Sequence, residues 1–234
     1  PDNIFGHWII DLMKRGAKII AIDPRLSWFA SRAEKWLRLR PGTDGALAMG
    51  FLNVIINEGL YDEGFVEKWT NAHHLIRSDT GKLLRESELV DGGSQSNFVV
   101  WDTVDEKPVI WNSDEVTYKS PNVKPALKGH FEVDLKDGTR VQARTVWNLF
   151  CEEVNRYPLG RVAEITLVPE KDIRDAAILY AKSKPASIHW GVPIDMTPAV
   201  TPTAQAIACL WCLTGNLDVP GGNVISRYAF DAVA

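Results

Sequence analysis

The sequence predicts an α/β fold with a parallel-sheet unit near its start and an antiparallel β-hairpin insertion in its middle. Residues 7–15 carry apolar side chains at helical spacing, and Gly16 follows as a C-terminal stop. Residues 17–22 form a largely β-branched run that Asp23-Pro24 ends, which is typical of a strand buried on both faces. Later in the chain, Asp137-Gly138 lies between two β-rich segments and is a strong hairpin signal.

Two further helices are expected before residue 70. Thr43 and Asp44 are predicted to cap a helix over residues 45–58, whose apolar side chains lie almost all round it. We therefore expect that helix to be deeply packed. A short helix capped by Asp62 should follow and end near Trp69.

The composition changes over about residues 71–145, where short β-rich pieces alternate with polar turns. Segments 98–101 and 109–111 flank one such turn, and segments 131–133 and 141–143 flank the Asp-Gly turn. We interpret this region as an insertion into one α/β domain that spans residues 1–234, and not as a domain of its own.

The last third of the chain returns to α/β character. Expected elements are helices over about 145–156 and 170–183, an inner strand over 186–190, a loop over 191–200, a helix with Thr201 as its cap and Pro202 at its first position that ends at Gly215, and a final loop over 216–223.

Composition excludes several classes of protein. The 234 residues are 45% hydrophobic and 24% charged, with a net charge of −4, which gives no general attraction to nucleic acid or anionic membranes. No apolar run approaches the roughly 18 to 20 residues that a membrane span needs. The three cysteines suggest no disulfide framework. The chain opens with Pro1 instead of Met, as an excised fragment would, so the compartment stays open.

Three loops are candidates for ligand binding. Asp23-Pro24-Arg25 follows a buried strand, where acidic residues of open α/β sheets often hold a ribose, although no G-x-G-x-x-G motif precedes it. Gly42-Thr43-Asp44 opens a helix, and a carboxylate there matches the two donors of the guanine edge. Residues 190–198 follow the expected last strand. The alternatives are a turn or cap at the first loop, a simple N-cap at the second and an ordinary β–α connection at the third.

Several other residues favour structural interpretations. Cys209 and Cys212 have C-x-x-C spacing but lie on an apolar helix, which favours the core over a metal site. His73-His74 is expected to be a surface pair. His189 is expected to be a core histidine rather than a residue that points into the crevice. A basic set brackets the first two loops and is either a solvated face or a phosphate contact: Arg25, Arg32, Lys35, Arg38 and Arg40.

Taken together, the motifs resemble those of the dimethyl sulfoxide reductase superfamily of molybdopterin oxidoreductases. The resemblance rests on five segments in matching order: G-A-K-I-I-A-I-D-P-R at 16–25, R-P-G-T-D-G-A-L-A at 40–48, N-x-I-I-x-E-G-L-Y-D at 53–62, W-G-V-P-I-D-M at 190–196 and L-T-G-N-L-D-V-P-G-G-N-V at 213–224. Three further features look most like one branch: L-I-R-S-D-T-G-K-L-L-R at 75–85, the hairpin insertion, and D-M-T-P at 195–198 followed by T-A-Q-A-I-A at 203–208. That branch includes acetylene hydratase, pyrogallol–phloroglucinol transhydroxylase, reductases and aromatic dehydroxylases.

The resemblance implies a three-layer αβα domain with a mostly parallel, dinucleotide-binding-like sheet. This domain would bind one half of a bis(molybdopterin guanine dinucleotide) cofactor with molybdenum or tungsten. It assigns nine residues to cofactor binding: Asp23, Pro24, Arg25, Gly42, Thr43, Asp44, Trp190, Gly191 and, less directly, Asp195. The family's metal ligand, iron–sulfur cysteines and closing domain would lie outside this chain, so no catalytic or metal residue is assigned and the fragment alone should be inactive. An iron–sulfur electron-transfer subunit is an expected partner, beside the rest of the polypeptide.

The leading functional interpretation is redox or oxygen-atom transfer on a small substrate. A non-redox hydratase or transhydroxylase of the same superfamily is the first alternative, and a non-catalytic nucleotide-binding module is the second. The substrate, the choice of metal and the oligomeric state stay open at this point.

Overall fold

A computed structural model describes residues 6–224 and divides the chain into two compact units, residues 1–61 with 154–234 and residues 62–153. The elements of the first unit are α1 (Gly6–Lys14), β1 (Ile20–Ile22), the 3₁₀ turn η1 (Ala30–Arg32), β2 (Lys35–Leu37), α2 (Asp44–Asn57), α6 (Leu159–Thr166), α7 (Glu170–Lys182), α8 (Val192–Asp195) and α9 (Val200–Leu213). None of the described helices is both long and apolar enough to cross a membrane.

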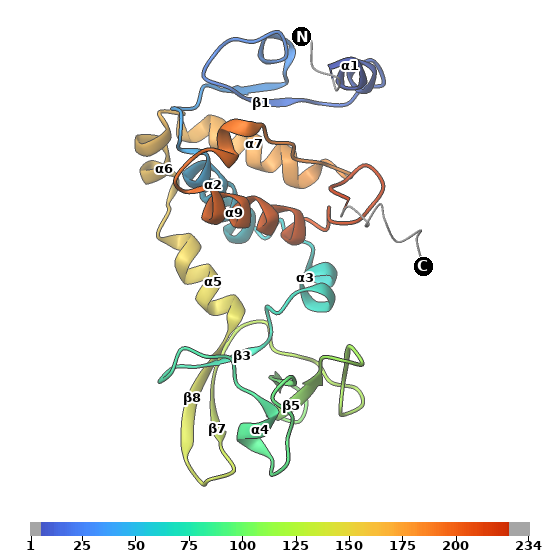
Figure 1. Ribbon diagram of the computed structural model, residues 1–234, viewed down its shortest axis with the longest axis vertical. Coiled ribbons are helices and arrows are strands. Elements are labelled where there is room, and N and C mark those ends of the chain that lie inside the picture. Colours follow the sequence, from blue (N-terminus) through green and yellow to red (C-terminus); the bar gives the residue numbers. More distant parts are fainter. Residues whose placement is uncertain (1–5, 225–234) are drawn as a thin grey trace. The chain divides into compact units, whose positions relative to one another are not determined.

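Helix α2 forms the centre of the first unit, with α6, α7 and α9 packed around it (Figure 1). Its apolar sequence explains this position, because Leu52 and Ile55 are fully buried. Gly50 allows α6 to approach closely, since a Cβ there would lie 2.9 Å from a methyl carbon of Val162. The predicted deep packing of this helix is therefore confirmed.

The α/β class is confirmed, but most strand pairs are antiparallel. Among the described strands, only β1 and β2 pair in parallel, with Ile20 opposite Lys35 and Ile22 opposite Leu37. Ile22 is 44% exposed, so the expectation of burial on both faces of this strand is wrong within the described residues. Both faces of a parallel strand are buried only when other elements cover both sides of its sheet, and the exposure of Ile22 leaves one side of β1 open within the described residues.

No strand forms over the predicted segment 186–190. Two asparagine side chains bind its backbone in place of a neighbouring strand. Asn216 Oδ1 accepts from the Ala186 N–H at 3.0 Å, while Asn223 Oδ1 accepts from Ile188 N–H and its Nδ2 donates to Ile188 O, both at 2.9 Å. The segment is hydrogen-bonded by these side chains, but it forms no ladder with a strand.

The second unit is β-rich. Its elements are α3 (Glu63–Trp69), β3 (Leu75–Arg77), α4 (Glu86–Leu89), β4 (Phe98–Asp102), β5 (Lys107–Asn112), β6 (Thr117–Tyr118), β7 (His130–Asp134), β8 (Arg140–Thr145) and the start of α5 (Val146–Asn155). They form two antiparallel sheets, ordered β3-β8-β7 and β4-β5-β6. The buried side chains of Leu75, Leu84, Val99, Val133 and Val141 belong to one core.

Local turn signals account for this unit. Gly138 adopts a φ of +83°, and the Asp137 carboxylate accepts a hydrogen bond from Thr139 N–H at 2.9 Å, as a tight hairpin turn requires. The predicted pairing of β7 with β8, and that of β4 with β5, is confirmed. Asp62 caps α3 by accepting from Phe65 N–H at 3.0 Å.

Candidate functional site

The first candidate loop follows β1. Asp23 is held there by three hydrogen bonds: its N–H donates to Leu37 O at 3.2 Å, its carbonyl accepts from Trp36 Nε1 at 2.8 Å, and its Oδ1 accepts from Arg25 N–H at 2.8 Å. Its second carboxylate oxygen, Oδ2, has no hydrogen bond within residues 6–224. Pro24 and Arg25 are exposed. The turn thus presents one carboxylate oxygen, Asp23 Oδ2, as a free hydrogen-bond acceptor, and hydrogen bonds to β2 fix the backbone that carries it.

The second loop opens helix α2. Gly42 has a φ of +81°, and a Cβ there would meet no atom within 4 Å, so its outer side is open. Thr43 occupies the N-cap position, as predicted, but its hydroxyl donates to Arg40 O at 2.6 Å and caps nothing. Among the described residues, no side chain therefore satisfies the first N–H groups of α2.

Asp44 is the first residue of α2 and does not cap it. Its carboxyl group is half-buried, and burial raises its pKa above the usual range, with a smaller opposing effect of its own backbone N–H. A desolvated carboxylate at a helix start is stabilised by hydrogen-bond donors that a ligand brings.

Packing of α2 against its neighbours fixes the position of this second loop. Arg40 N–H donates to Thr166 O at the end of α6 at 2.9 Å. A Cβ on Gly45 would lie 2.8 Å from Thr203 Oγ1, so the first turns of α2 and α9 lie close together. Because α9 follows directly after the third loop, this contact brings the second and third loops into one neighbourhood.

The third loop contains an aromatic pair. Trp190 Nε1 donates to Asp195 Oδ1 at 3.1 Å, and the Trp190 ring stacks on that of Trp211 with centroids 5.7 Å apart and planes 10° apart. The Nε1 of Trp211 is buried and has no partner among the described residues. Gly191 caps α8 with an ordinary φ of −100°, so its backbone requires no glycine.

The structure brings together only some of the predicted residues. No hydrogen bond or ion pair within residues 6–224 connects Asp23 with Asp44. Lys35 of the basic set pairs with Asp175 at 2.9 Å, and Arg32 lies over the Trp28 ring at 4.1 Å. The side chains of Arg25, Arg38 and Arg40 are exposed and make no ion pair with the described residues.

Four structural expectations need correction or refinement. His73 and His74 are 2% and 6% exposed, so the expected surface pair is buried, because aromatic rings of β4, β5 and β6 cover both imidazoles. His189 is exposed and not in the core, because the expected inner strand is absent. Cys209 and Cys212 do lie on α9, where they are half-buried. Helix α9 begins at Val200 with Ala199 as its N-cap, so Thr201 is not its cap.

Sequence reasoning missed the asparagines that position the third loop. Asn216 is buried, and its Nδ2 donates to the Thr214 hydroxyl at 2.8 Å, while its Oδ1 and Asn223 bind residues 186–188. The available signal was the Asn-x₆-Asn spacing inside the motif at 213–224, where a Gly-Gly pair directly precedes the second asparagine. Such a short polar loop between two tight turns favours side chain–backbone hydrogen bonds.

Comparisons with known proteins identify the family. The family model described as "Molybdopterin oxidoreductase" matches residues 4–232. The chain is 33% identical to perchlorate reductase subunit alpha of Dechloromonas aromatica, over 94% of this chain and 26% of that protein. It is 31% identical to dimethylsulfide dehydrogenase subunit alpha of Rhodovulum sulfidophilum, over 98% of this chain and 25% of that protein.

The solved structure of acetylene hydratase from Pelobacter acetylenicus superimposes with a TM-score of 0.52 at 29% identity, over 88% of this chain and 18% of that one. The chain thus spans about a quarter of the length of the curated relatives described above. It belongs to the molybdopterin oxidoreductase family, among relatives of the dimethyl sulfoxide reductase type that its motifs resemble.

Proposed function

We propose that this chain is the part of a molybdenum or tungsten oxidoreductase that holds the guanosine end of one molybdopterin guanine dinucleotide of a bis-dinucleotide cofactor. The observation that carries the proposal is the start of α2. There, an open glycine, uncapped backbone N–H groups and a half-buried carboxylate that no other residue of the described chain binds occur on three successive residues, Gly42, Thr43 and Asp44.

The chemistry of this loop suits guanine. Guanine presents two adjacent N–H donors, and a carboxylate offers two acceptors at matching separation, whereas adenine would place an acceptor against it. Asp44 would therefore bind the base. Asp23 Oδ2 would bind the ribose, since Oδ1 is already engaged by Arg25 N–H.

The remaining site residues have supporting roles in this proposal. Pro24 and Arg25 would shape the ribose turn, and Trp190, Gly191 and Asp195 would lie toward the middle of the cofactor. When bound, the metal centre would supply the redox or Lewis-acid chemistry. This chain's own residues would bind and orient the dinucleotide and keep water from its base, and we assign none of them a catalytic role.

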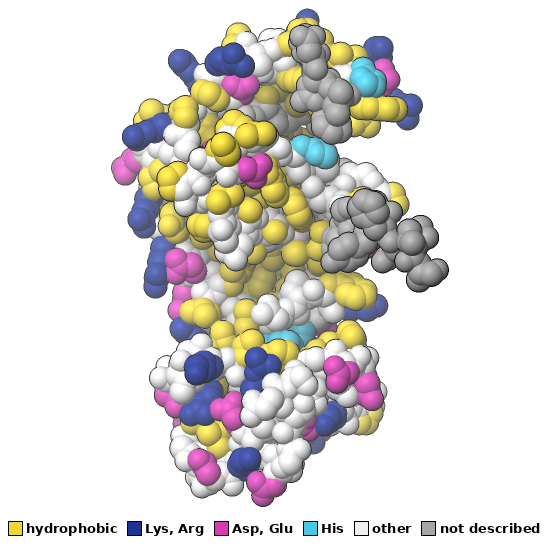
Figure 2. Space-filling view, viewed as in Figure 1, with side chains coloured by type: hydrophobic (Ala, Val, Ile, Leu, Met, Phe, Trp, Pro, Cys, Tyr) yellow, Lys and Arg dark blue, Asp and Glu magenta, His cyan; other side chains and the backbone are white. Residues whose placement is uncertain are grey.

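The full-length protein would complete both the fold and the enzyme. Large apolar side chains are exposed on the first unit: Trp8, Leu26, Leu167, Val192 and Met196 are each more than 60% exposed. Figure 2 shows yellow hydrophobic patches over the helices of this unit. We infer that the rest of the polypeptide covers them and adds strands beside β1 and β2, giving a three-layer αβα domain with residues 62–153 as its insertion. An iron–sulfur cluster, the metal ligand and contacts to an electron-transfer subunit would also come from outside this chain.

Redox chemistry is the function we favour, because perchlorate reductase and dimethylsulfide dehydrogenase are redox enzymes by name. A non-redox hydratase is the second candidate, and the similarity to acetylene hydratase supports it. The full-length enzyme can be assayed without any electron donor or acceptor. Loss of substrate turnover under these conditions would favour a redox enzyme, and continued hydration of an alkyne would favour a hydratase.

The test of the proposal is Asp44→Asn in the full-length enzyme. Asparagine keeps the shape but replaces one acceptor by a donor that faces a guanine donor. We expect cofactor content to fall by about tenfold or more, the loss that one charge-assisted hydrogen bond represents. Guanosine released by acid and the metal are the quantities to measure.

A matched control separates cofactor binding from helix capping. Asp62 is a true N-cap at α3, where asparagine caps about as well as aspartate. Asp62→Asn should therefore retain full cofactor content. The melting temperature of cofactor-free Asp44→Asn should not fall, because that side chain caps nothing. Full guanosine content in Asp44→Asn enzyme would reject the assignment.

A further inference from the structure

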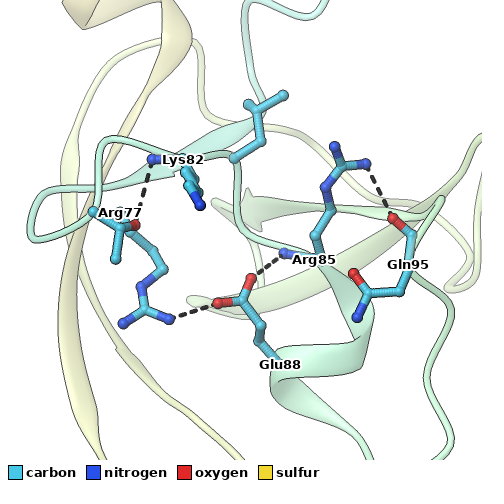
Figure 3. Close-up of a pocket in the computed structure, with 7 residues that line it drawn as sticks. Arg77, Lys82, Arg85, Glu88 and Gln95 are labelled. Carbon is cyan, nitrogen blue, oxygen red and sulfur yellow. Dashed lines mark hydrogen bonds and ion pairs between the residues drawn. The ribbon is translucent and has the colours of Figure 1, made fainter.

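A hollow of about 560 Å³ lies in the second unit, between the β3–α4 connection and the segment before β4. Five of the residues that line it carry polar or charged side chains that bear on its chemistry: Arg77, Lys82, Arg85, Glu88 and Gln95 (Figure 3). All of them come from one stretch of 19 positions, 77–95, within residues 62–153, so the hollow belongs to a single compact unit. None of the motifs of the proposed cofactor site lies in this stretch.

The one acidic side chain that lines the hollow is already neutralised. Glu88 Oε1 accepts from Arg77 Nη1 at 2.5 Å, and its Oε2 accepts from the Arg85 backbone N–H at 2.9 Å. Figure 3 shows Glu88 between the two arginines. Arg77 is equally occupied, because its Nε and Nη2 donate to the two carboxylate oxygens of Asp79 at 3.0 and 2.7 Å.

Two cationic side chains that line the hollow, Lys82 and Arg85, have no carboxylate partner among the described residues. The Lys82 ammonium has no partner within residues 6–224. The Arg85 guanidinium lies 4.1 Å above the Phe98 ring, and its Nη1 donates to Gln95 O at 3.1 Å, so its orientation is fixed. Its Nε and Nη2 have no acceptor among the described residues. An immobilised fork with free donors, in a hollow that a free ammonium also lines, is preorganised for an oxyanion.

We infer that this hollow binds a carboxylate group, with Arg85 as the bidentate partner and Lys82 as the second cation. A planar guanidinium matches the two oxygens of a carboxylate, and the ammonium adds a charge that needs no fixed geometry. The carboxylate can come from a small dicarboxylic acid or from an acidic side chain on a peptide. The volume of the hollow is within the range of about 300 to 1,000 Å³ that small-molecule sites occupy.

Calorimetric titration of the 234-residue chain at low salt tests the inference with three probes: succinate, its uncharged counterpart succinamide and an acetylated Glu-Ser-Glu peptide. We expect saturable binding of succinate, of the peptide or of both, and none of succinamide. Binding of succinate alone identifies a free acid as the ligand class, and binding of the peptide alone identifies an acidic segment.

Three variants locate the site. Lys82→Gln removes a side chain without protein partners, and Arg85→Lys keeps the charge but loses the fork. Each should weaken binding by about tenfold or more, the loss expected for one charge-assisted hydrogen bond. Lys124→Gln is the matched control, because it removes the same charge from another exposed position of the unit. Absence of saturable binding, or equal weakening in Lys124→Gln, would overturn the inference.

Discussion

Mild acid should destabilise the second unit through its buried histidine pair. His73 and His74 lie side by side with ring centroids 5.1 Å apart, and the Nδ1 of each is buried without a partner among the described residues. Burial lowers the pKa of His73 to about 4. Burial lowers the pKa of His74 to about 3, with smaller contributions from His73 and from the positive charge of Arg85. The other neighbours are aromatic, with Tyr118 hydroxyl 3.4 Å from His73 Nε2 and the Phe98 ring stacked on His74.

The sign of the pH effect follows from these directions. The unfolded chain has histidines with pKa values near 6.5, so below that pH it binds more protons than the folded unit. The stability that depends on both neutral imidazoles is complete above pH 6.5 and falls as the pH drops toward 4 and then 3. One unit below the unfolded pKa, each histidine costs about 1.4 kcal/mol, or roughly 2.7 kcal/mol for the pair. That is a large part of the roughly 5–15 kcal/mol that stabilises a domain.

Urea unfolding at about pH 7 and pH 5.5 measures this difference, with amide hydrogen exchange in β4 and β5 as the local probe. His74→Phe should lose about half of the pH dependence, since phenylalanine keeps the stacked ring. His130→Gln is the control, because His130 is exposed on β7 and should leave the dependence unchanged. Equal free energies of unfolding at the two pH values in the unaltered chain would refute this reasoning.

Three further outcomes are expected. Purified 234-residue chain should carry less than stoichiometric molybdenum, tungsten or iron by elemental analysis, because no three potential ligands converge within residues 6–224; one metal per chain would contradict this. Cys209 and Cys212 should react slowly with a thiol reagent until urea is added, because burial raises the pKa of both thiols, and fast labelling of the folded chain would show otherwise. Gly222→Ala should destabilise the first unit by about 1–3 kcal/mol, since a Cβ there overlaps Asn216 O, while Gly160→Ala in the same unit, at an ordinary 3.4 Å contact with Glu170 Oε1, should not.

The helices and hairpins were predicted well because the residues that specify a helix cap or a hairpin turn lie within a few positions of one another in the sequence. The Asp137-Gly138 turn and the Asp62 cap are read from adjacent positions, and both occur as expected. The prediction of a strand over 186–190 was wrong because a strand depends on residues that are distant in sequence. A strand needs a partner strand, and in this chain its backbone is bound by Asn216 and Asn223, about 30 residues further on.

The sequence could predict that a helix begins at the second candidate loop, but it could not predict the hydrogen bonds that hold this loop. The sequence indicated that Gly42, Thr43 and Asp44 open a helix, yet it could not reveal that the Thr43 hydroxyl binds Arg40 O. That hydrogen bond is what leaves the first turn of α2 without a cap. The burial of His73 and His74 was equally invisible, because the rings that cover them come from strands β4 to β6, which are distant in sequence.

The supports of the candidate loops lie outside the loops themselves. The turn before α2 is held by Arg40 on the carbonyl of Thr166 and by the close approach of Gly45 to Thr203. Both contacts come from packing of α6 and α9 on α2, so a change in that packing moves the Asp44 carboxylate without touching it. Substitutions at Gly45 or Thr203 should therefore alter cofactor affinity even though neither residue is assigned a ligand contact. For this reason, tolerance to mutation in the turn that we propose to bind the dinucleotide is better judged from helix contacts than from the turn sequence.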